Sequence, residues 1–171
     1  MSMTLAQPLT PLRWIVIPAL QVVVATWLFT MPLQLFGLRP PEPVFAMVLA
    51  FAWAVIRPSV LAPFCLLLLG IGMDLLWGSP LGLWSVAMLI PYGAVLSVRN
   101  MLMGQQFPVL WLGFAVACGM AELTGVLVTQ ILAHATPQIL GVFYQWGVTV
   151  ALYPLAHRLI ERFDDADVRF R

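Results

Sequence analysis

The chain has 171 residues, of which 62% are hydrophobic and only 9% are charged. Soluble domains of this size carry far more charge, so the composition excludes a soluble globular protein and indicates an integral membrane protein that lies almost wholly in the bilayer. The net charge is +1 and all eight basic residues are arginines, so the sequence offers no basic surface for nucleic acid.

The first apolar run, residues 14–36, is long enough to cross a hydrocarbon core of about 30 Å, which takes about 20 helical residues. It is too long for the apolar region of a signal peptide, about 7–15 residues, so we expect it to be retained as the first span. Thr26, Thr30 and Gln34 recur every four residues and are expected on one helix face. Arg39 lies in the proline-rich loop that follows.

The second apolar run, residues 44–56, is short. A helix of that length reaches only about 20 Å, so the run is either a short tilted span or a re-entrant segment. We favour a span, because its large apolar side chains would otherwise lack apolar surroundings. We therefore expect a single membrane domain with six spans and a charged tail. The expected spans are residues 14–36, 44–56, 60–77, 81–98, 107–133 and 139–160, with a loop-like segment at 99–106 and a tail at 161–171.

The arginines orient these spans, because cytoplasmic loops carry an excess of Lys and Arg. With six crossings, Arg39 is the only arginine outside, and Arg57, Arg99 and the C-terminal arginines are cytoplasmic. With five crossings, Arg13 is the only one outside, so this rule does not choose between the two topologies. Both place the C-terminus in the cytoplasm and the turn at residues 78–80 outside.

Two carboxylates, Asp74 and Glu122, lie within apolar runs. An acid inside a span costs about 2.5–3.5 kcal/mol on insertion scales and is typically used with a partner. At about 1.5 Å per residue, both acids fall in the outer half of the membrane. Glu122 shares its face with small and polar residues and is therefore expected to point into the bundle. These residues are Ala115, Gly119, Gly125 and Thr129.

Two interpretations of the buried polar groups remain open. They either hydrogen-bond one another and hold the bundle together, or they line an outward-facing pocket or partner groove. In the second case Asp74 and Glu122 form its wall, and Arg39 neutralises one of them. The last span adds a polar seam to either arrangement, made of Gln145, Thr149, Tyr153 and His157.

An enzyme is a weaker alternative. Two intramembrane carboxylates could act as an acid and a base, and Gly70-x-Gly72-x-Asp74 is close to the GxGD pattern of intramembrane aspartyl proteases. Its spacing differs by one residue, and the second acid is a glutamate. The sequence shows no phosphate loop or metal-ligand cluster, so we predict neither catalysis nor a cofactor.

Residues 74–82 read Asp-Leu-Leu-Trp-Gly-Ser-Pro-Leu-Gly, and here the chain resembles the MreD family of bacterial rod shape-determining membrane proteins. That family carries an apolar helix ending in Asp and two hydrophobic residues, a small residue, Gly-Ser-Pro-Leu-Gly, and another helix. Trp77 stands where a small or polar residue is more usual. The resemblance implies an all-α bundle of about six transmembrane helices, similar in architecture to the substrate-binding components of energy-coupling-factor transporters.

The resemblance also implies a function. We expect a non-enzymatic scaffold of the cell-elongation complex in the bacterial cytoplasmic (inner) membrane, which binds MreC and supports lateral peptidoglycan synthesis. A RodA-type glycosyltransferase and a penicillin-binding transpeptidase would join directly or through the complex, and MreB indirectly. The alternative is the substrate-binding membrane component of a small-molecule transporter. The residues expected to shape a partner groove are Asp74, Gly78, Ser79, Pro80, Gly82, Glu122 and Arg39.

Overall fold

The computed structural model describes residues 11–30, 42–56, 59–134 and 137–158, and within these ranges the chain is all-helical, with no strand. The prediction of an all-α protein is therefore confirmed. The helices are α1 (Pro11–Thr30), α2 (Ala46–Ile56), α3 (Leu61–Trp77), α4 (Leu83–Leu102), α5 (Phe107–Ala133) and α6 (Ile139–Ala151). Beyond a break at Leu152, residues 153–158 continue the direction of α6 as a further short helix.

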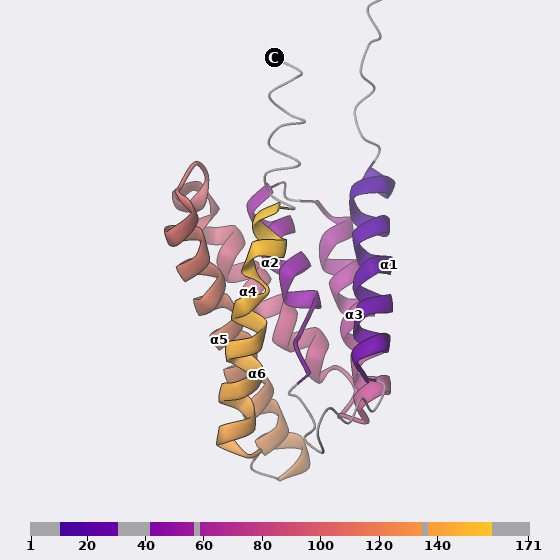
Figure 1. Cartoon of the computed structure of the whole chain (residues 1–171). Coiled ribbons are helices and arrows are strands. Elements are labelled where there is room, and N and C mark those ends of the chain that lie inside the picture. Colours follow the sequence, from indigo (N-terminus) through magenta and orange to yellow (C-terminus); the bar gives the residue numbers. More distant parts are fainter. Residues whose placement is uncertain (1–10, 31–41, 57–58, 135–136, 159–171) are drawn as a thin grey trace, which may run out of the picture.

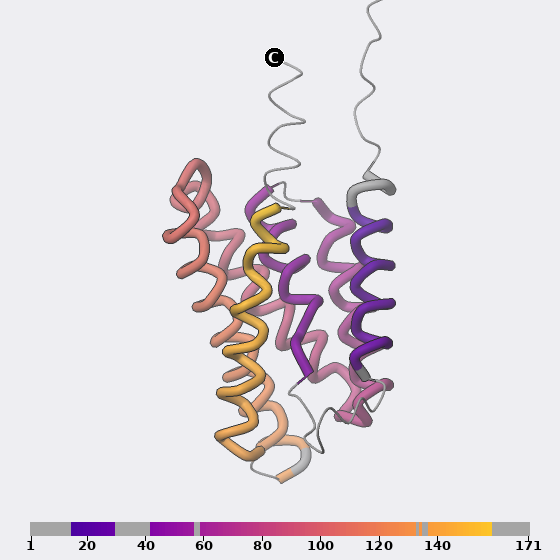
Figure 2. Tube along the Cα trace, in the orientation of Figure 1, coloured from indigo at the N-terminus to yellow at the C-terminus, as the bar shows by residue number. Residues whose placement is uncertain are grey.

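Consecutive helices run in opposite directions along one bundle (Figure 1). The start of α1 and the end of α6 lie at the same end, at the top of the view, together with the link from α4 to α5. The link from α3 to α4 and the one from α5 to α6 lie at the opposite end. Figure 2 follows the same alternating path as a tube and shows α2 in the middle of the bundle.

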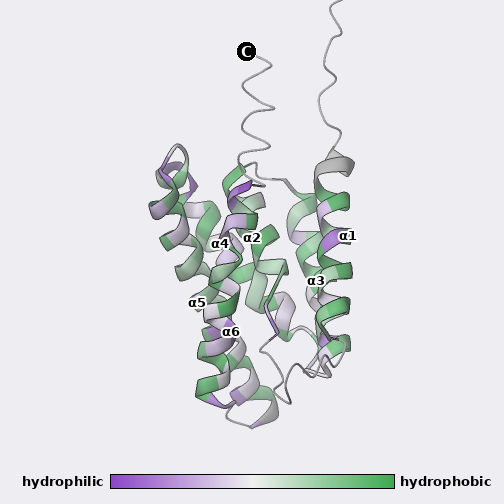
Figure 3. Cartoon of the chain, viewed as in Figure 1, coloured by the Kyte–Doolittle hydropathy of each residue, from purple (hydrophilic) through white to green (hydrophobic). Residues whose placement is uncertain are grey.

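Three of the described helical segments are long and apolar enough to cross a membrane: Leu83–Leu102, Phe107–Leu132 and Ile139–Arg158. Three shorter apolar segments accompany them: Ile15–Phe29, Ala46–Ile56 and Leu61–Trp77. Hydrophobic residues predominate along the helices in Figure 3. Large apolar side chains are exposed along α1, α3, α5 and α6 in particular. Because such a surface is stable in lipid rather than in water, the structure describes a membrane protein.

The shortest helix, α2, forms the centre of the core. Every residue from Ala46 to Val55 is buried, and the helix packs against α1, α3, α4 and α5. Phe51 makes an edge-on contact with Phe114 of α5, with ring centroids 5.4 Å apart. The apolar surroundings that we expected for this segment are therefore provided by the rest of the bundle.

Helix α2 alone is about 16 Å long, so the segment reaches across the bundle only with the residues before it. Residues 42–44 are not helical, and non-helical backbone at membrane depth needs hydrogen-bond partners from elsewhere in the protein. Helix α6 supplies two. The Val44 N–H donates to Thr149 Oγ1 at 3.1 Å, and Gln145 Nε2 donates to the Glu42 carbonyl at 3.1 Å. Two members of the expected polar seam therefore hold the non-helical residues 42–44 against α6.

The predicted loop at residues 99–106 is wrong at its start, because α4 continues to Leu102. Arg99 lies in the last turn of this helix, where its Nε donates to the Val55 carbonyl at 2.9 Å and its Nη2 donates to the Ile56 carbonyl at 3.1 Å. These are the last two carbonyls of α2, which have no partner within their own helix. The hydrogen bond from Arg99 to Val55, which lies 44 residues earlier, thus attaches the last turn of α4, a segment whose polar residues had suggested a loop.

Candidate functional site

Asp74 lies one turn before the end of α3, and its side chain is only 1% exposed. Its carboxylate turns toward the start of α4. Ser79 Oγ donates to Asp74 Oδ1 at 2.7 Å, the Gly82 N–H donates to Oδ2 at 2.7 Å, and the Trp84 N–H donates to Oδ1 at 3.1 Å. Two of the three partners of Asp74 are therefore backbone N–H groups, and Arg39, which was expected to neutralise one of the two acids, lies outside the described residues.

This arrangement caps a helix that has no capping side chain of its own. The residue before α4 is Gly82, and its first turn contains no acidic residue. The first N–H groups of a helix lack internal partners and form the positive end of its dipole. The carboxylate of Asp74 supplies both an acceptor and a negative charge there, from the preceding helix.

The turn between α3 and α4 depends on two glycines in the left-handed region, Gly78 at φ 65° and Gly82 at φ 92°. Residues with a Cβ rarely adopt these conformations. The Gly78 N–H donates to the Asp74 carbonyl oxygen, and the Ser79 N–H donates to the same oxygen at 3.1 Å. Asp74 thus closes the turn with its main chain as well as its side chain.

Next to this turn, α3 and α4 approach each other closely, and this contact holds the two helices together. A Cβ at Gly70 would meet the backbone N and Cα of Ser85 at a separation that real Cβ atoms essentially never show. Ser85 Oγ in turn donates to the Leu67 carbonyl at 2.9 Å. The Trp77 and Trp84 rings, 4.9 Å apart, make an edge-on contact beside the turn. The sequence had not predicted this contact between Gly70 and Ser85, because nothing local marks which glycine faces a neighbour.

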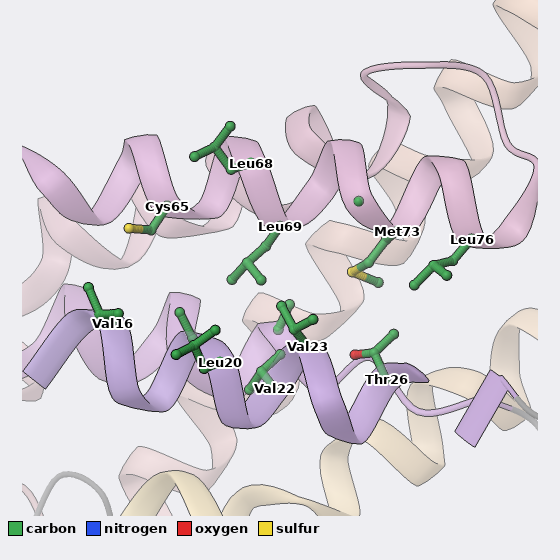
Figure 4. Close-up of a pocket in the computed structure, with 13 residues that line it drawn as sticks. Val16, Leu20, Val22, Val23, Thr26, Cys65, Leu68, Leu69, Met73 and Leu76 are labelled. Atoms are coloured by element: carbon green, nitrogen blue, oxygen red, sulfur yellow. The ribbon is translucent and has the colours of Figure 1, made fainter. Parts of the chain in front are cut away.

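An apolar groove of about 260 Å³ lies between α1 and α3 and reaches the last turn of α3 before the Asp74 turn. Figure 4 shows labelled side chains of α1 and α3 on the two sides of the groove, with Leu68 turned away from α1. Among the residues that line it, Thr26 is the only one with a hydroxyl, as expected for the inner face of α1; the side chains of Thr30 and Gln34 fall outside what the structure describes. The lining residues are Val16, Ala19, Leu20, Val22, Val23, Thr26, Ala46, Cys65, Leu68, Leu69, Gly72, Met73 and Leu76.

Glu122 occupies a separate place. It lies near the middle of α5, is 8% exposed, and lines a cavity of about 970 Å³ between α5 and α6. Asp74 does not line that cavity. The face of α5 carrying Glu122 divides between two neighbours. A Cβ at Gly125 would approach Leu83 of α4, whereas one at Gly119 would approach Trp146 of α6.

Helices α5 and α6 are joined by tryptophan side chains at two levels. Trp111 Nε1 donates to the Val150 carbonyl at 3.3 Å, and Trp146 Nε1 donates to the Ala115 carbonyl at 3.0 Å. At the end where α6 finishes, the Tyr153 hydroxyl lies 3.5 Å from His157 Nδ1, and both rings contact Phe107. The part of the seam formed by Tyr153 and His157 is thus structural, which the spacing alone did not show.

The fold and the site together define a helical membrane protein with a carboxylate-capped turn, an apolar groove and a separate cavity that contains an acid. Comparison of the chain with protein-family models, curated proteins and solved structures finds no match. The functional assignment therefore depends on the residues and geometry described above.

Proposed function

We propose that the protein is a non-enzymatic scaffold of the MreD type in the bacterial inner membrane. In this role it binds MreC within the cell-elongation complex and supports lateral peptidoglycan synthesis. The RodA-type glycosyltransferase and the penicillin-binding transpeptidase associate with it directly or through that complex, and MreB indirectly. The six helices then form six membrane-crossing segments, as in the energy-coupling-factor components that the MreD family resembles.

The turn organised by Asp74 is the observation that carries this proposal. The nine residues 74–82 that prompted the resemblance form one hydrogen-bonded unit, in which the acid, the serine and both glycines each have a definite task. Three donors within the turn bond the two oxygens of Asp74, and the side chain is buried, so its acceptor capacity is largely used by the fold. The geometry thus favours a shaping role for Asp74 over catalysis.

The groove between α1 and α3 is the surface that we assign to the partner. Its walls are apolar, and among the described helices α1 packs mainly against α3 and less against α2, while many of its large apolar side chains remain exposed. A transmembrane helix of MreC could bury its side chains there by the close packing that drives helix association in lipid. The Asp74 turn would then lie beside the point at which the partner leaves the membrane.

The arginines give the orientation. Arg99 and Arg158 lie at the end of the bundle where α1 begins and the chain leaves α6. Under the positive-inside rule that end is cytoplasmic, so the C-terminus is cytoplasmic and the Asp74 turn faces the outer side of the membrane.

Cysteine cross-linking in native membranes tests the docking surface, because Cys65 lines the groove. In a Cys118→Ala background, single cysteines along the MreC transmembrane helix should form a disulfide with Cys65 at helical spacing. The control chain carries Cys65→Ala, Cys118→Ala and Leu112→Cys, since Leu112 is exposed on α5. Adducts formed through residue 112 but not through Cys65 would place the partner elsewhere, and failure to recover MreC with either chain would contradict the scaffold itself.

A second candidate is the substrate-binding component of a small-molecule transporter. The cavity beside Glu122 favours it, because its volume lies within the range of about 300–1,000 Å³ typical of ligand sites. Co-purification of ATP-binding subunits with a coupling membrane protein, in place of MreC and the wall synthases, would support this candidate over the scaffold.

A further inference from the structure

The cavity between α5 and α6 extends from the link between these helices into the membrane region. Pro137 and Gln138 line one end, and Gly119, Glu122 and Trp146 line the other. Glu122 lies 11 residues before Ala133, the last residue of α5, which corresponds to a depth of roughly 16 Å. The acid is therefore placed well inside the bundle, at the inner end of a cavity of about 970 Å³.

Glu122 has no hydrogen-bond or ion-pair partner among the residues that the structure describes, although only 8% of it is exposed. This contrasts with Asp74, whose oxygens both accept hydrogen bonds. A carboxylate inside a membrane is costly and marks a functional site by default. The carboxylate of Glu122 therefore faces the cavity as a hydrogen-bond acceptor that the described residues do not use.

The remaining lining is mostly apolar and includes two aromatic side chains, Phe143 and Trp146. Gln130 and Gln138 add polar groups toward the link between the helices. An acid together with aromatic rings is suited to an organic cation, because the carboxylate neutralises the charge while ring faces attract it. The apolar walls are suited to a hydrophobic body attached to that charge.

We propose that this cavity binds a lipophilic organic cation, a positively charged group carried on an apolar body, with Glu122 as its counter-ion. The cavity is open on one side, where Leu140 and Phe143 are exposed, so an apolar body can enter it from the lipid. This proposal does not depend on the scaffold function, since it concerns α5 and α6 rather than the groove between α1 and α3.

The test uses the purified full chain in nanodiscs of phosphatidylglycerol, whose headgroup carries no cation, titrated in a calorimeter with tetraphenylphosphonium. Empty nanodiscs report partition into the lipid and are subtracted, and tetraphenylborate, of nearly the same shape and opposite charge, tests whether the protein-dependent signal selects the cation. We expect saturable binding of the cation only, weakened more than tenfold by Glu122→Gln. Leu127→Ala, an exposed change on the same helix outside the cavity, should leave binding unchanged.

A second variant keeps the test decisive if Glu122→Gln does not fold. Val126 lines the cavity one helical turn from Glu122, and Val126→Trp should obstruct access to the carboxylate while leaving it in place, so binding should again be weakened. Nanodiscs that contain phosphatidylethanolamine separate two sources of the cation. Weaker apparent binding there indicates that the lipid ammonium headgroup competes for the site, and unchanged binding indicates a free ligand.

Three results would overturn the proposal. One is equal binding of the cation by the wild-type chain and the Glu122→Gln variant. Another is the absence of a saturable, protein-dependent signal that is larger for the phosphonium than for the borate. The third is capture of a polypeptide by a photoreactive residue placed at position 126 in native membranes, because the cavity would then be occupied by a protein.

Discussion

The backbone N–H of Gly82 donates to Oδ2 of Asp74 at 2.7 Å, so the side chain of one helix caps the next across eight residues of sequence. This contact joins α3 to α4 at the turn that we place on the outer side of the membrane. It also makes the turn sensitive to the chemistry of a single side chain.

Asp74→Asn should reduce the free energy of unfolding by about 1–3 kcal/mol. Both aspartate oxygens accept hydrogen bonds, whereas an asparagine has one acceptor oxygen and would direct its NH₂ group at a donor. Thermal unfolding in detergent measures the effect, and Ser79→Ala, which removes one donor, should cost less. If the Asn variant proves as stable as the wild type, the capping role assigned to Asp74 is incorrect.

Gly70→Ala should destabilise the chain by about 1–3 kcal/mol, the usual cost of overpacking. The new methyl group would meet the backbone of Ser85, which cannot move without shifting α4. Gly72→Ala is the matched control on the same helix, because a Cβ there has no heavy atom within 4 Å. Comparison of their melting temperatures checks the close approach of α3 and α4, and equal melting temperatures would argue against it.

Thr149→Val should also cost about 1–3 kcal/mol, because it leaves the buried Val44 N–H without its acceptor. Thr124→Val is the matched control. Thr124, like Thr149, donates to the carbonyl four residues earlier in its own helix, but it receives no bond from another segment. Denaturation in mild detergent should show a larger loss for residue 149, and similar losses would mean that residues 42–44 do not depend on α6.

Arg99→Lys should weaken the attachment of α4 to the end of α2 by about 1–2 kcal/mol. The guanidinium bonds two carbonyls at once in a fixed geometry, which a lysine ammonium cannot reproduce. Arg158→Lys, at an exposed position at the same end, is the control. Unfolding free energies that are unchanged in both variants would contradict the assigned role of Arg99.

The all-helical membrane class followed from composition and run length alone, because burying so much apolar surface in water is impossible for a chain of this size. The task of Asp74 was also partly predictable. A lone acid beside a Gly-Ser-Pro turn has few donors other than the nearby backbone, so local sequence contained the necessary information.

What sequence could not predict depends on contacts between distant residues. Nothing near Thr149 indicates that its hydroxyl serves Val44, which lies 105 residues away. Likewise, the spacing of Glu122 and its small neighbours placed it inside the bundle but could not say that α4 and α6 share that face. The groove interpretation therefore grouped the two acids, although only Glu122 lines the cavity between α5 and α6.

The attachments of α2 have a consequence for how the protein enters the membrane. An 11-residue helix is too short to be retained in lipid by its own hydrophobicity, and the partners of its two ends belong to α4 and α6. During synthesis, α2 leaves the ribosome long before either partner exists. Helix α2 must therefore reach its final position late, after α6 has been made. Until then the insertion machinery must keep this helix from water and lipid.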